Sequence, residues 1–350
     1  MIKSFGPEIS EKSPASPAKL PSSSSYNQQQ RNKLTAFIIG GIIVFLLVLI
    51  GIFAVGLYAY NWNDQITNKV ISVVPYPAVK IDSKFVSYKA YRDDIETLRY
   101  FYDSQGETAG VVPTDSEIDE LVLNRLVREW LTAEEAKAKS VSVNDEAVDE
   151  NFSGLVEQAG SEEEVAKTLT DFYNWDVTTF KKKVIVPYLY REGLQIKLLA
   201  DEKNIEDLTS TAQSIIDQLA DGADFAELAG QYSADVSTAS NGGDLGYFGR
   251  GVMVSAFEEA AFALEIGQVS GIVKTDFGYH ILKLEDKREV DVGEDGTKAE
   301  EIHVRHILLT VNVDDWLNEQ LKTKSISVYV PGFTWDAEQA SIIADNTESE

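Results

Sequence analysis

Residues 212–287 read AQSIIDQLADGADFAELAGQYSADVSTASNGGDLGYFGRGVMVSAFEEAAFALEIGQVSGIVKTDFGYHILKLEDK, and this stretch decides the fold of one domain. Apolar residues recur at helical spacing in its first part, and Gly242-Gly243 marks a turn near its middle. The pattern then predicts a strand over 245–248, a helix over 257–264 and a strand over 279–284. Together these elements form a small α+β domain.

Three motifs in this stretch occur together: GGDLGYF at 242–248, the helical pattern M…F…AAFAL at 253–264, and VKTDFGYHILK at 273–283. In combination they resemble the parvulin family of peptidyl-prolyl cis/trans isomerases. The resemblance implies a four-stranded antiparallel sheet with flanking helices. It also implies an apolar pocket for the proline ring of a substrate, lined here by Leu245, Met253 and Phe257.

Beside that pocket the family places two histidines, an aspartate or cysteine, and a threonine. Matched position by position, the resemblance assigns His280, Asp235 and Thr275 to three of these places, as catalytic residues. Each residue alone has an ordinary structural interpretation, because an aspartate in a polar loop is usually solvated. Because these residues belong to the shared motifs, we favour the functional interpretation over the structural one. The resemblance implies no cofactor.

The sequence departs from the family where the first strand and the second histidine should stand. The segment before Thr211 has no histidine, whereas IHVRHILLT occurs at 302–310, after the domain should have ended. We infer a circular permutation of a domain over 203–310, in which 288–301 is a linker and 302–310 supplies the missing strand with His306. A truncated second copy of the domain is the competing explanation, but the remaining 40 residues cannot complete one.

The chain has three histidines, His280, His303 and His306, and a zinc site built on all three is the metal alternative. Side chains alternate along a strand, so His303 and His306 should point to opposite faces. All three cannot easily converge on one ion, and we expect no metal site.

Residues 63–202 are predicted to form a mainly helical domain. A strand is expected over 79–85, Ser87 and Asn144 are candidate N-caps, and Thr114-Glu117 and Ser161-Glu164 are candidate capping boxes. Pro187 predicts a kink or break. The runs LVLNRLVREWLTAEEAKAKSVSVNDEAV and GSEEEVAKTLTDFYNWDVTTFKKKV resemble the N-terminal helical domain of bacterial periplasmic chaperone-isomerases. A scaffold that binds no client is the alternative for this domain.

A membrane segment is predicted over 34–62, because 36–60 is strongly apolar and about 20 such residues cross a bilayer. The polar residues 1–33 are interpreted as a disordered cytoplasmic tail, and their five basic residues against two acidic ones place the N-terminus in the cytoplasm. The net charge of −26 argues against nucleic acid as a partner. Without cysteine, neither a disulfide nor a lipidated cysteine is possible.

These observations predict an extracytoplasmic, membrane-anchored folding factor that isomerises X-Pro bonds in unfolded secreted or envelope polypeptides. Two alternatives stay open: an anchored chaperone that uses the parvulin fold only for binding, and a structural adaptor of the cell envelope. Residues 311–350 are expected to be a C-terminal extension, in which 325–335 is predicted to be a strand that extends a sheet or packs on the helical domain. Its acidic start, with Asp314 and Asp315, argues against a preference for phosphorylated substrates.

Overall fold

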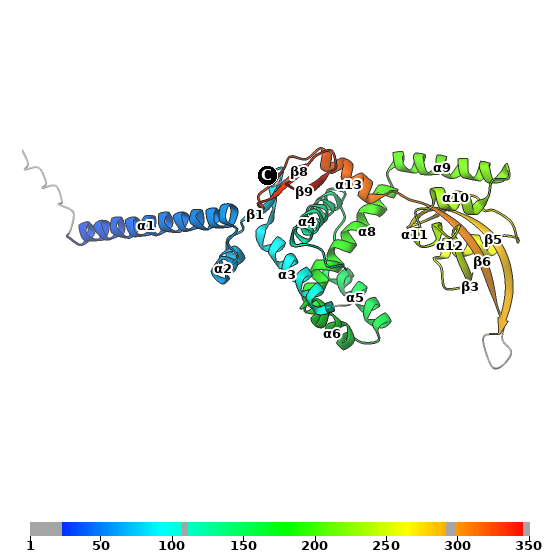
Figure 1. The fold of residues 1–350 in the computed structure, drawn as a ribbon, viewed down its shortest axis with the longest axis horizontal. Coiled ribbons are helices and arrows are strands. Elements are labelled where there is room, and N and C mark those ends of the chain that lie inside the picture. The colour runs from blue at the N-terminus through cyan, green and yellow to red at the C-terminus, as the bar shows by residue number, and fades with distance from the viewer. Residues whose placement is uncertain (1–22, 107–110, 292–297, 346–350) are drawn as a thin grey trace, which may run out of the picture. The chain divides into compact units, whose positions relative to one another are not determined.

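The computed structural model describes residues 23–106, 111–291 and 298–345. The chain divides into an N-terminal unit, residues 1–74, and a second unit, residues 75–350 (Figure 1). The mixture of helices and antiparallel sheets confirms the expected α+β class.

The N-terminal unit consists of two helices, α1 (Ser23–Tyr60) and α2 (Gln65–Val73). Asp64 caps α2 by accepting hydrogen bonds from the backbone N–H groups of Ile66 and Thr67. Helix α1 begins at Ser23, so 23–33 are helical where a disordered tail was expected, because no proline interrupts the chain after Pro21. The rest of the expected tail, 1–22, lies outside the described residues.

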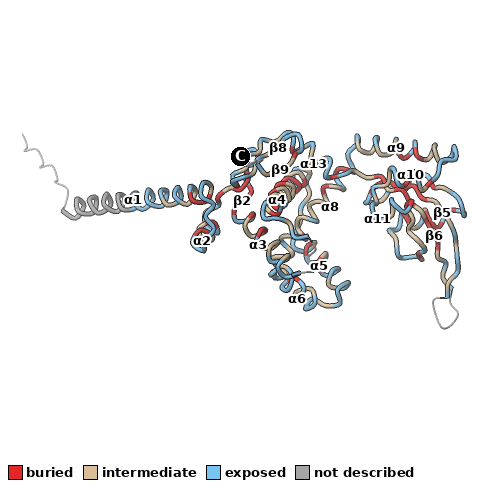
Figure 2. The backbone as a smooth tube through the Cα atoms, viewed as in Figure 1, coloured by how far each residue is buried: buried red, intermediate tan, exposed pale blue. Residues whose placement is uncertain are grey.

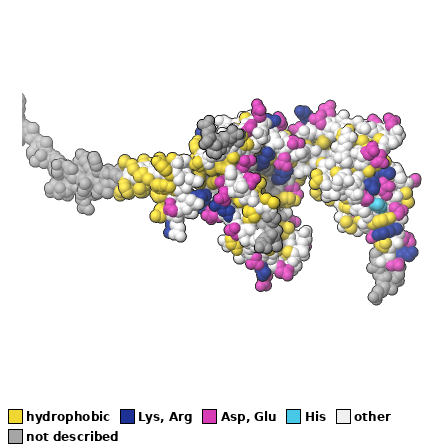
Figure 3. All heavy atoms as spheres, in the orientation of Figure 1, with side chains coloured by type: hydrophobic (Ala, Val, Ile, Leu, Met, Phe, Trp, Pro, Cys, Tyr) yellow, Lys and Arg dark blue, Asp and Glu magenta, His cyan; other side chains and the backbone are white. Residues whose placement is uncertain are grey.

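Among the described residues, one helix is long and apolar enough to cross a membrane, over Ile42–Tyr60 with a mean hydropathy of 2.9. Hydrophobic side chains cover the described end of α1 in the space-filling view (Figure 3).

The second unit begins with a helical lobe. Its elements are α3 (Tyr88–Gln105), α4 (Asp115–Ala138), α5 (Asp145–Ala159), α6 (Glu162–Tyr173), α7 (Val177–Phe180), the π-helical turn η2 (Lys181–Ile185) and α8 (Val186–Leu199). The four predicted N-caps accept a hydrogen bond from a backbone N–H of their helices, and the capping box is complete at Thr114-Glu117. At Ser161 the structure has the N-cap bond alone. The π-turn directly before Pro187 is the irregularity predicted there.

A buried carboxylate connects three parts of this lobe. Asp94 of α3 is only 5% exposed, and it pairs with Arg125 of α4 at 2.5 Å and with Lys183 of η2. A buried charge needs such partners to offset its desolvation, so the ion pairs orient α3, α4 and η2 relative to one another.

The C-terminal residues fold back onto the helical lobe. Strand β7 (Ile326–Val328) pairs with β1 (Pro77–Ile81), which pairs with β2 (Lys84–Ser87); α13 (Val313–Lys322) contacts α4 and α8, and β8 (Phe333–Asp336) pairs with β9 (Ser341–Ala344). The Asn124 side chain of α4 bonds both the N–H and the C=O of Ile342. Residues 311–345 are therefore integrated into the lobe rather than appended to it.

The expected single strand over 79–85 is wrong, because β1 ends at Ile81 and β2 starts at Lys84. Asp82 lies between them with a φ of 52°, a left-handed conformation that aspartate tolerates in turns. The chain therefore reverses into an antiparallel pair at this point.

The isomerase-like lobe follows α8 in the sequence. Its elements are α9 (Glu202–Ala220), α10 (Phe225–Tyr232), α11 (Val236–Ala239), β3 (Asp244–Phe248), α12 (Ser255–Ala263), β4 (Val273–Thr275), β5 (Gly278–Asp291) and β6 (Lys298–Leu309). The four strands form the expected antiparallel sheet, and their order in it is β3-β6-β5-β4.

Strand β6 lies at the centre of this sheet although it comes last along the chain. It pairs antiparallel with β5, from Tyr279 opposite Leu309 to Leu284 opposite Val304, which confirms the predicted strand pairing. The expected linker at 288–301 is wrong in its described part, because pairing continues to Asp291 opposite Lys298. Oppositely charged residues such as Arg288 and Glu301 face each other there and favour an extended ladder.

Both faces of the sheet are packed, and the buried positions concentrate along β5 and β6 (Figure 2). On one face Ile281, Ile307 and Leu309 pack with α9 and α10. On the other face Leu282, Leu284 and Val304 pack with Phe257 and other residues of α12. Alternation along β5 and β6 therefore separates the two apolar clusters.

Candidate active site

A cavity of about 320 Å³ opens on the α12 side of the sheet. It is lined by Asp235, Leu245, Val252, Met253, Val254, Phe257, Phe277, His280, His306 and Leu308. The structure thus brings together six of the seven predicted site residues around one cavity, and the seventh, Thr275, bonds His280. As expected from strand alternation, His306 and Leu308 face the cavity while Ile307 and Leu309 lie in the opposite core.

A chain of hydrogen bonds joins the four polar residues. The Thr275 hydroxyl lies 2.8 Å from His280 Nε2, the two Nδ1 atoms of His280 and His306 are 3.4 Å apart, and His306 Nε2 lies 2.8 Å from an Asp235 carboxylate oxygen. Both imidazoles are about 95% buried, and their rings stack with an interplanar angle of 19°. Burial and stacking hold the chain in one arrangement.

The carboxylate fixes the direction of the hydrogen bond at its end of the chain. An ionised Asp235 can only accept, so His306 Nε2 donates to it. His280 Nδ1 faces His306 Nδ1, and His280 Nε2 faces the Thr275 hydroxyl. The Phe277 N–H donates to the Thr275 oxygen at the other end of the chain.

The pKa values agree with this assignment. Burial, and then the proximity of His306, lowers the pKa of His280 to about 4, although Asp235 opposes the shift. Burial alone would raise the pKa of Asp235, but hydrogen bonds from Ser237, Thr238 and His306 outweigh it and hold that pKa well below its ordinary value. At neutral pH, His280 is therefore neutral and Asp235 is ionised.

We expect the folded state to lose stability as the pH falls from about 6.5 to about 4. The unfolded state protonates His280 near its ordinary pKa, whereas the folded state resists protonation until about pH 4, so the proton favours unfolding in this interval. The loss should reach at most about 3 kcal/mol, and chemical denaturation across the interval measures it. A His280→Gln variant serves as the control, and an unchanged pH slope in that variant would contradict the assignment.

His303 lies outside the cavity. Its Nε2 is 2.7 Å from Asp244, and its ring packs against Tyr247 at 4.9 Å between centroids. Across the described residues, no group of three or more His, Asp or Glu side chains is arranged to hold a metal ion.

The sequence analysis did not assign Val252, Val254 or Phe277 to the cavity, although all three line it. They are exposed residues that form the rim of the cavity. Exposed positions do not follow the apolar periodicity by which buried residues are predicted. Val252 and Val254 flank Met253, and Phe277 follows Thr275 by two residues. Their proximity in sequence to these predicted residues could have indicated that they line the cavity.

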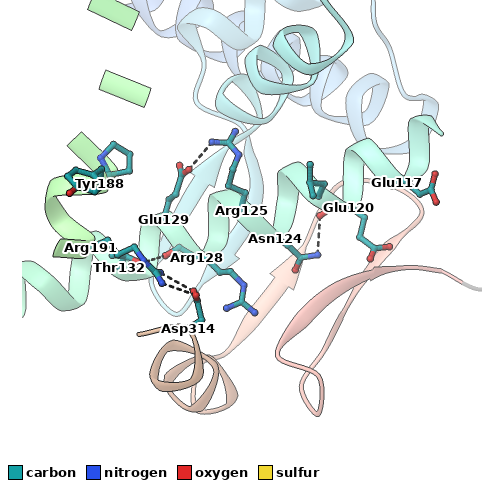
Figure 4. Close-up of a pocket in the computed structure, with 12 residues that line it drawn as sticks. Glu117, Glu120, Asn124, Arg125, Arg128, Glu129, Thr132, Tyr188, Arg191 and Asp314 are labelled. Atoms are coloured by element: carbon teal, nitrogen blue, oxygen red, sulfur yellow. Dashed lines mark hydrogen bonds and ion pairs between the residues drawn. The ribbon is translucent and has the colours of Figure 1, made fainter. Parts of the chain in front are cut away.

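A second hollow lies in the helical lobe, with a volume of about 810 Å³. Helix α4 lines one side through residues such as Leu121 and Arg125, while Tyr188 and Arg191 of α8 and Asp314 of α13 line the other (Figure 4). Its charged groups include internal pairs: Arg191 binds Asp314 through two hydrogen bonds of 2.9 and 2.8 Å, and Arg125 binds Glu129 at 2.8 Å.

Comparison with known families finds two matches along this chain. Residues 192–288 match the PPIC-type PPIASE domain, and residues 26–157 match the SurA-like N-terminal domain. The first match ends before β6, as expected if that strand stands outside its usual place in the chain. The predicted resemblance to a prolyl isomerase joined to a chaperone-like helical domain is therefore confirmed.

Several curated relatives carry the description "Foldase protein PrsA". The one from Caldanaerobacter subterraneus is 39% identical over 48% of this chain, and the one from Geobacillus kaustophilus is 36% identical over 63% of it. A solved PrsA structure from Bacillus cereus is 28% identical, with 62% of this chain and 77% of that chain covered at a TM-score of 0.23. This chain spans 57% and 62% of the length of the Caldanaerobacter relative and a relative from Geobacillus sp. WCH70. Because it also covers 77% of the Geobacillus kaustophilus protein, the chain belongs to the PrsA foldase family.

Proposed function

We propose that this protein is a membrane-anchored folding factor that catalyses cis/trans isomerisation of X-Pro bonds in unfolded secreted or envelope polypeptides. The observation that carries the proposal is one cavity that combines apolar walls with the buried chain from Thr275 to Asp235. Membership of the foldase family and the PPIC-type match support the same activity.

The apolar residues Leu245, Met253 and Phe257 are proposed to hold the proline ring. Rotation about the X-Pro bond has a barrier of ~20 kcal/mol and takes ~10–100 s without catalysis. An acceleration of about 10⁴ requires the twisted amide to be bound more tightly than either planar isomer by only ~5.5 kcal/mol. A cavity that fixes the ring while the preceding carbonyl turns can supply this preference without a covalent step.

The polar residues are proposed to hold the catalytic wall in place beside the turning carbonyl. Phe257 packs edge-on against both imidazoles, at 5.2 Å from His280 and 5.9 Å from His306 between centroids. Asp235 anchors one end of the chain and Thr275 the other. The histidines thus act as a hydrogen-bonded couple that positions the ring-binding wall rather than as an acid and a base.

Exchange between the isomers of a short proline tetrapeptide, followed by NMR with the full chain in lipid nanodiscs, tests the activity. We expect catalytic amounts of protein to accelerate exchange. If exchange keeps its uncatalysed rate while the chain still suppresses aggregation of an unfolded protein, the function is that of a non-catalytic chaperone.

The apolar helix α1 is proposed to anchor the protein, with the N-terminus in the cytoplasm and the second unit outside. Its apolar length and the basic residues before it support this orientation. A cysteine introduced at exposed Ser104 should react in intact cells with a membrane-impermeant maleimide. Reaction only after lysis would contradict the orientation.

A further inference from the structure

Three hollows of the second unit form a continuous series through shared residues. The proline-site cavity shares Val254 and Phe277 with an adjoining hollow of about 310 Å³. That hollow in turn shares Tyr188 and Arg191 with the large groove of the helical lobe (Figure 4). The three hollows therefore adjoin one another from the proline site to the groove.

Exposed apolar side chains mark each step of this route. Leu121, Tyr188, Ile196, Val254 and Phe277 all line one of the three hollows and are each 44–57% exposed. Tyr188 and Ile196 are separated by two turns of α8, so they lie on one face of that helix. Single exposed apolar residues are common on protein surfaces, whereas a contiguous group of them indicates a binding surface.

The charged groups along the route include pairs that are already satisfied within the protein. Arg191 binds Asp314, and Arg125 binds both Glu129 and the buried Asp94. These two cations are engaged by neighbouring carboxylates, and Arg128, which also lines the groove, donates to the side chain of Asn318. The exposed apolar side chains along the route suit an extended polypeptide that carries large apolar residues.

We propose that the client segment flanking the bound proline docks along α8, from the rim at Val254 and Phe277 past Ile196 and Tyr188 to the groove beside α4. The occupant is the same unfolded polypeptide whose proline lies in the active-site cavity, because the shared residues make the route continuous with that cavity. This inference rests on the proposed isomerase function and adds a second recognition element to it. The preferred clients then carry a large apolar residue at a defined distance from the proline.

A peptide-length series on the full chain in nanodiscs tests this route. Each peptide keeps the same tetrapeptide around proline and adds a Gly-Ser spacer of increasing length, on either side, that ends in Leu-Phe. Burial of such side chains should lower KM about tenfold at a favoured spacing and leave kcat unchanged. A KM that does not depend on the presence or spacing of the apolar residues would overturn the proposal.

Two serine variants locate the docking surface. Ile196→Ser should abolish the lower KM of the peptides that carry Leu-Phe at the favoured spacing. It should leave KM and kcat for the tetrapeptide unchanged. Leu155→Ser is the matched control, because Leu155 is also an exposed apolar helical residue but lines a hollow between α5 and α6 instead. Loss of the advantage in Leu155→Ser alone would place docking elsewhere and refute the route. Absence of turnover even for the tetrapeptide would instead refute the isomerase function itself.

Discussion

A Gly243→Ala variant should lose the folded isomerase lobe and, with it, the activity. Gly243 has a φ of +74°, and a Cβ atom there would lie 2.0 Å from the carbonyl oxygen of His306. The same glycine accepts a hydrogen bond from the His306 N–H at 2.8 Å, so β6 cannot move away without breaking this contact. The combined backbone strain and overpacking should cost about 3–5 kcal/mol, which is a large fraction of the stability of a domain.

Gly271→Ala is the matched control for this prediction. Gly271 lies in the same lobe, but nothing lies within 4 Å of a Cβ placed there, and its φ is outside the left-handed region. Urea denaturation of both variants measures the difference. Equal stability of the two variants would show that the close approach of Gly243 to β6 does not constrain the lobe.

A Phe257→Ala variant should lose most of the isomerase activity, by about 100-fold or more, even where it remains folded. Phe257 is only 3% exposed, lines the cavity and packs against both histidines, so its removal opens the proposed proline-binding wall. The cavity left behind should also destabilise the lobe by about 3–5 kcal/mol. Activity is therefore measured at a temperature at which circular dichroism shows the variant to be folded.

Phe262→Ala separates the two effects of the Phe257 substitution. Phe262 is a buried phenylalanine of the same helix and the same apolar cluster, yet it does not line the cavity. Its removal should destabilise the lobe by a similar amount and leave kcat/KM of the folded protein nearly unchanged. If both variants lose activity equally while folded, Phe257 has no specific role in binding proline.

The sequence predicted most of the isomerase-like lobe because its motifs indicate both the secondary-structure elements and the residues of the site. The helical periodicity near Phe225 and the glycines near Asp244 indicate the local elements, and family resemblance placed Asp235, His280 and Thr275 together. The position of His306 required a further step, which combined the absence of a first strand before α9 with the run IHVRHILLT at 302–310. The pairing of β6 with β5 agrees with that step.

Other features depend on long-range packing that local patterns do not record. The association of β7 with β1 joins residues about 250 positions apart, so the sequence predicted a strand within 325–335 but not which strand it pairs with. The continuation of β5 and β6 beyond Lys287 depends on cross-strand charge pairs such as Lys298 with Glu289. Neither partner of such a pair reveals the other from its own position in the chain.

The late position of β6 also bears on how the lobe folds. In the arrangement that the family resemblance implies, the first strand would precede α9 and find its partner only after about 80 intervening residues had closed into a loop. Here β5 and β6 follow each other directly along the chain, with Asp291 opposite Lys298. The central pairing thus becomes a local contact, which lowers the contact order of the lobe and favours faster folding. As the chain is synthesised from its N-terminus, α9 to β5 emerge ahead of β6, so His306 is the last of the four polar site residues to appear.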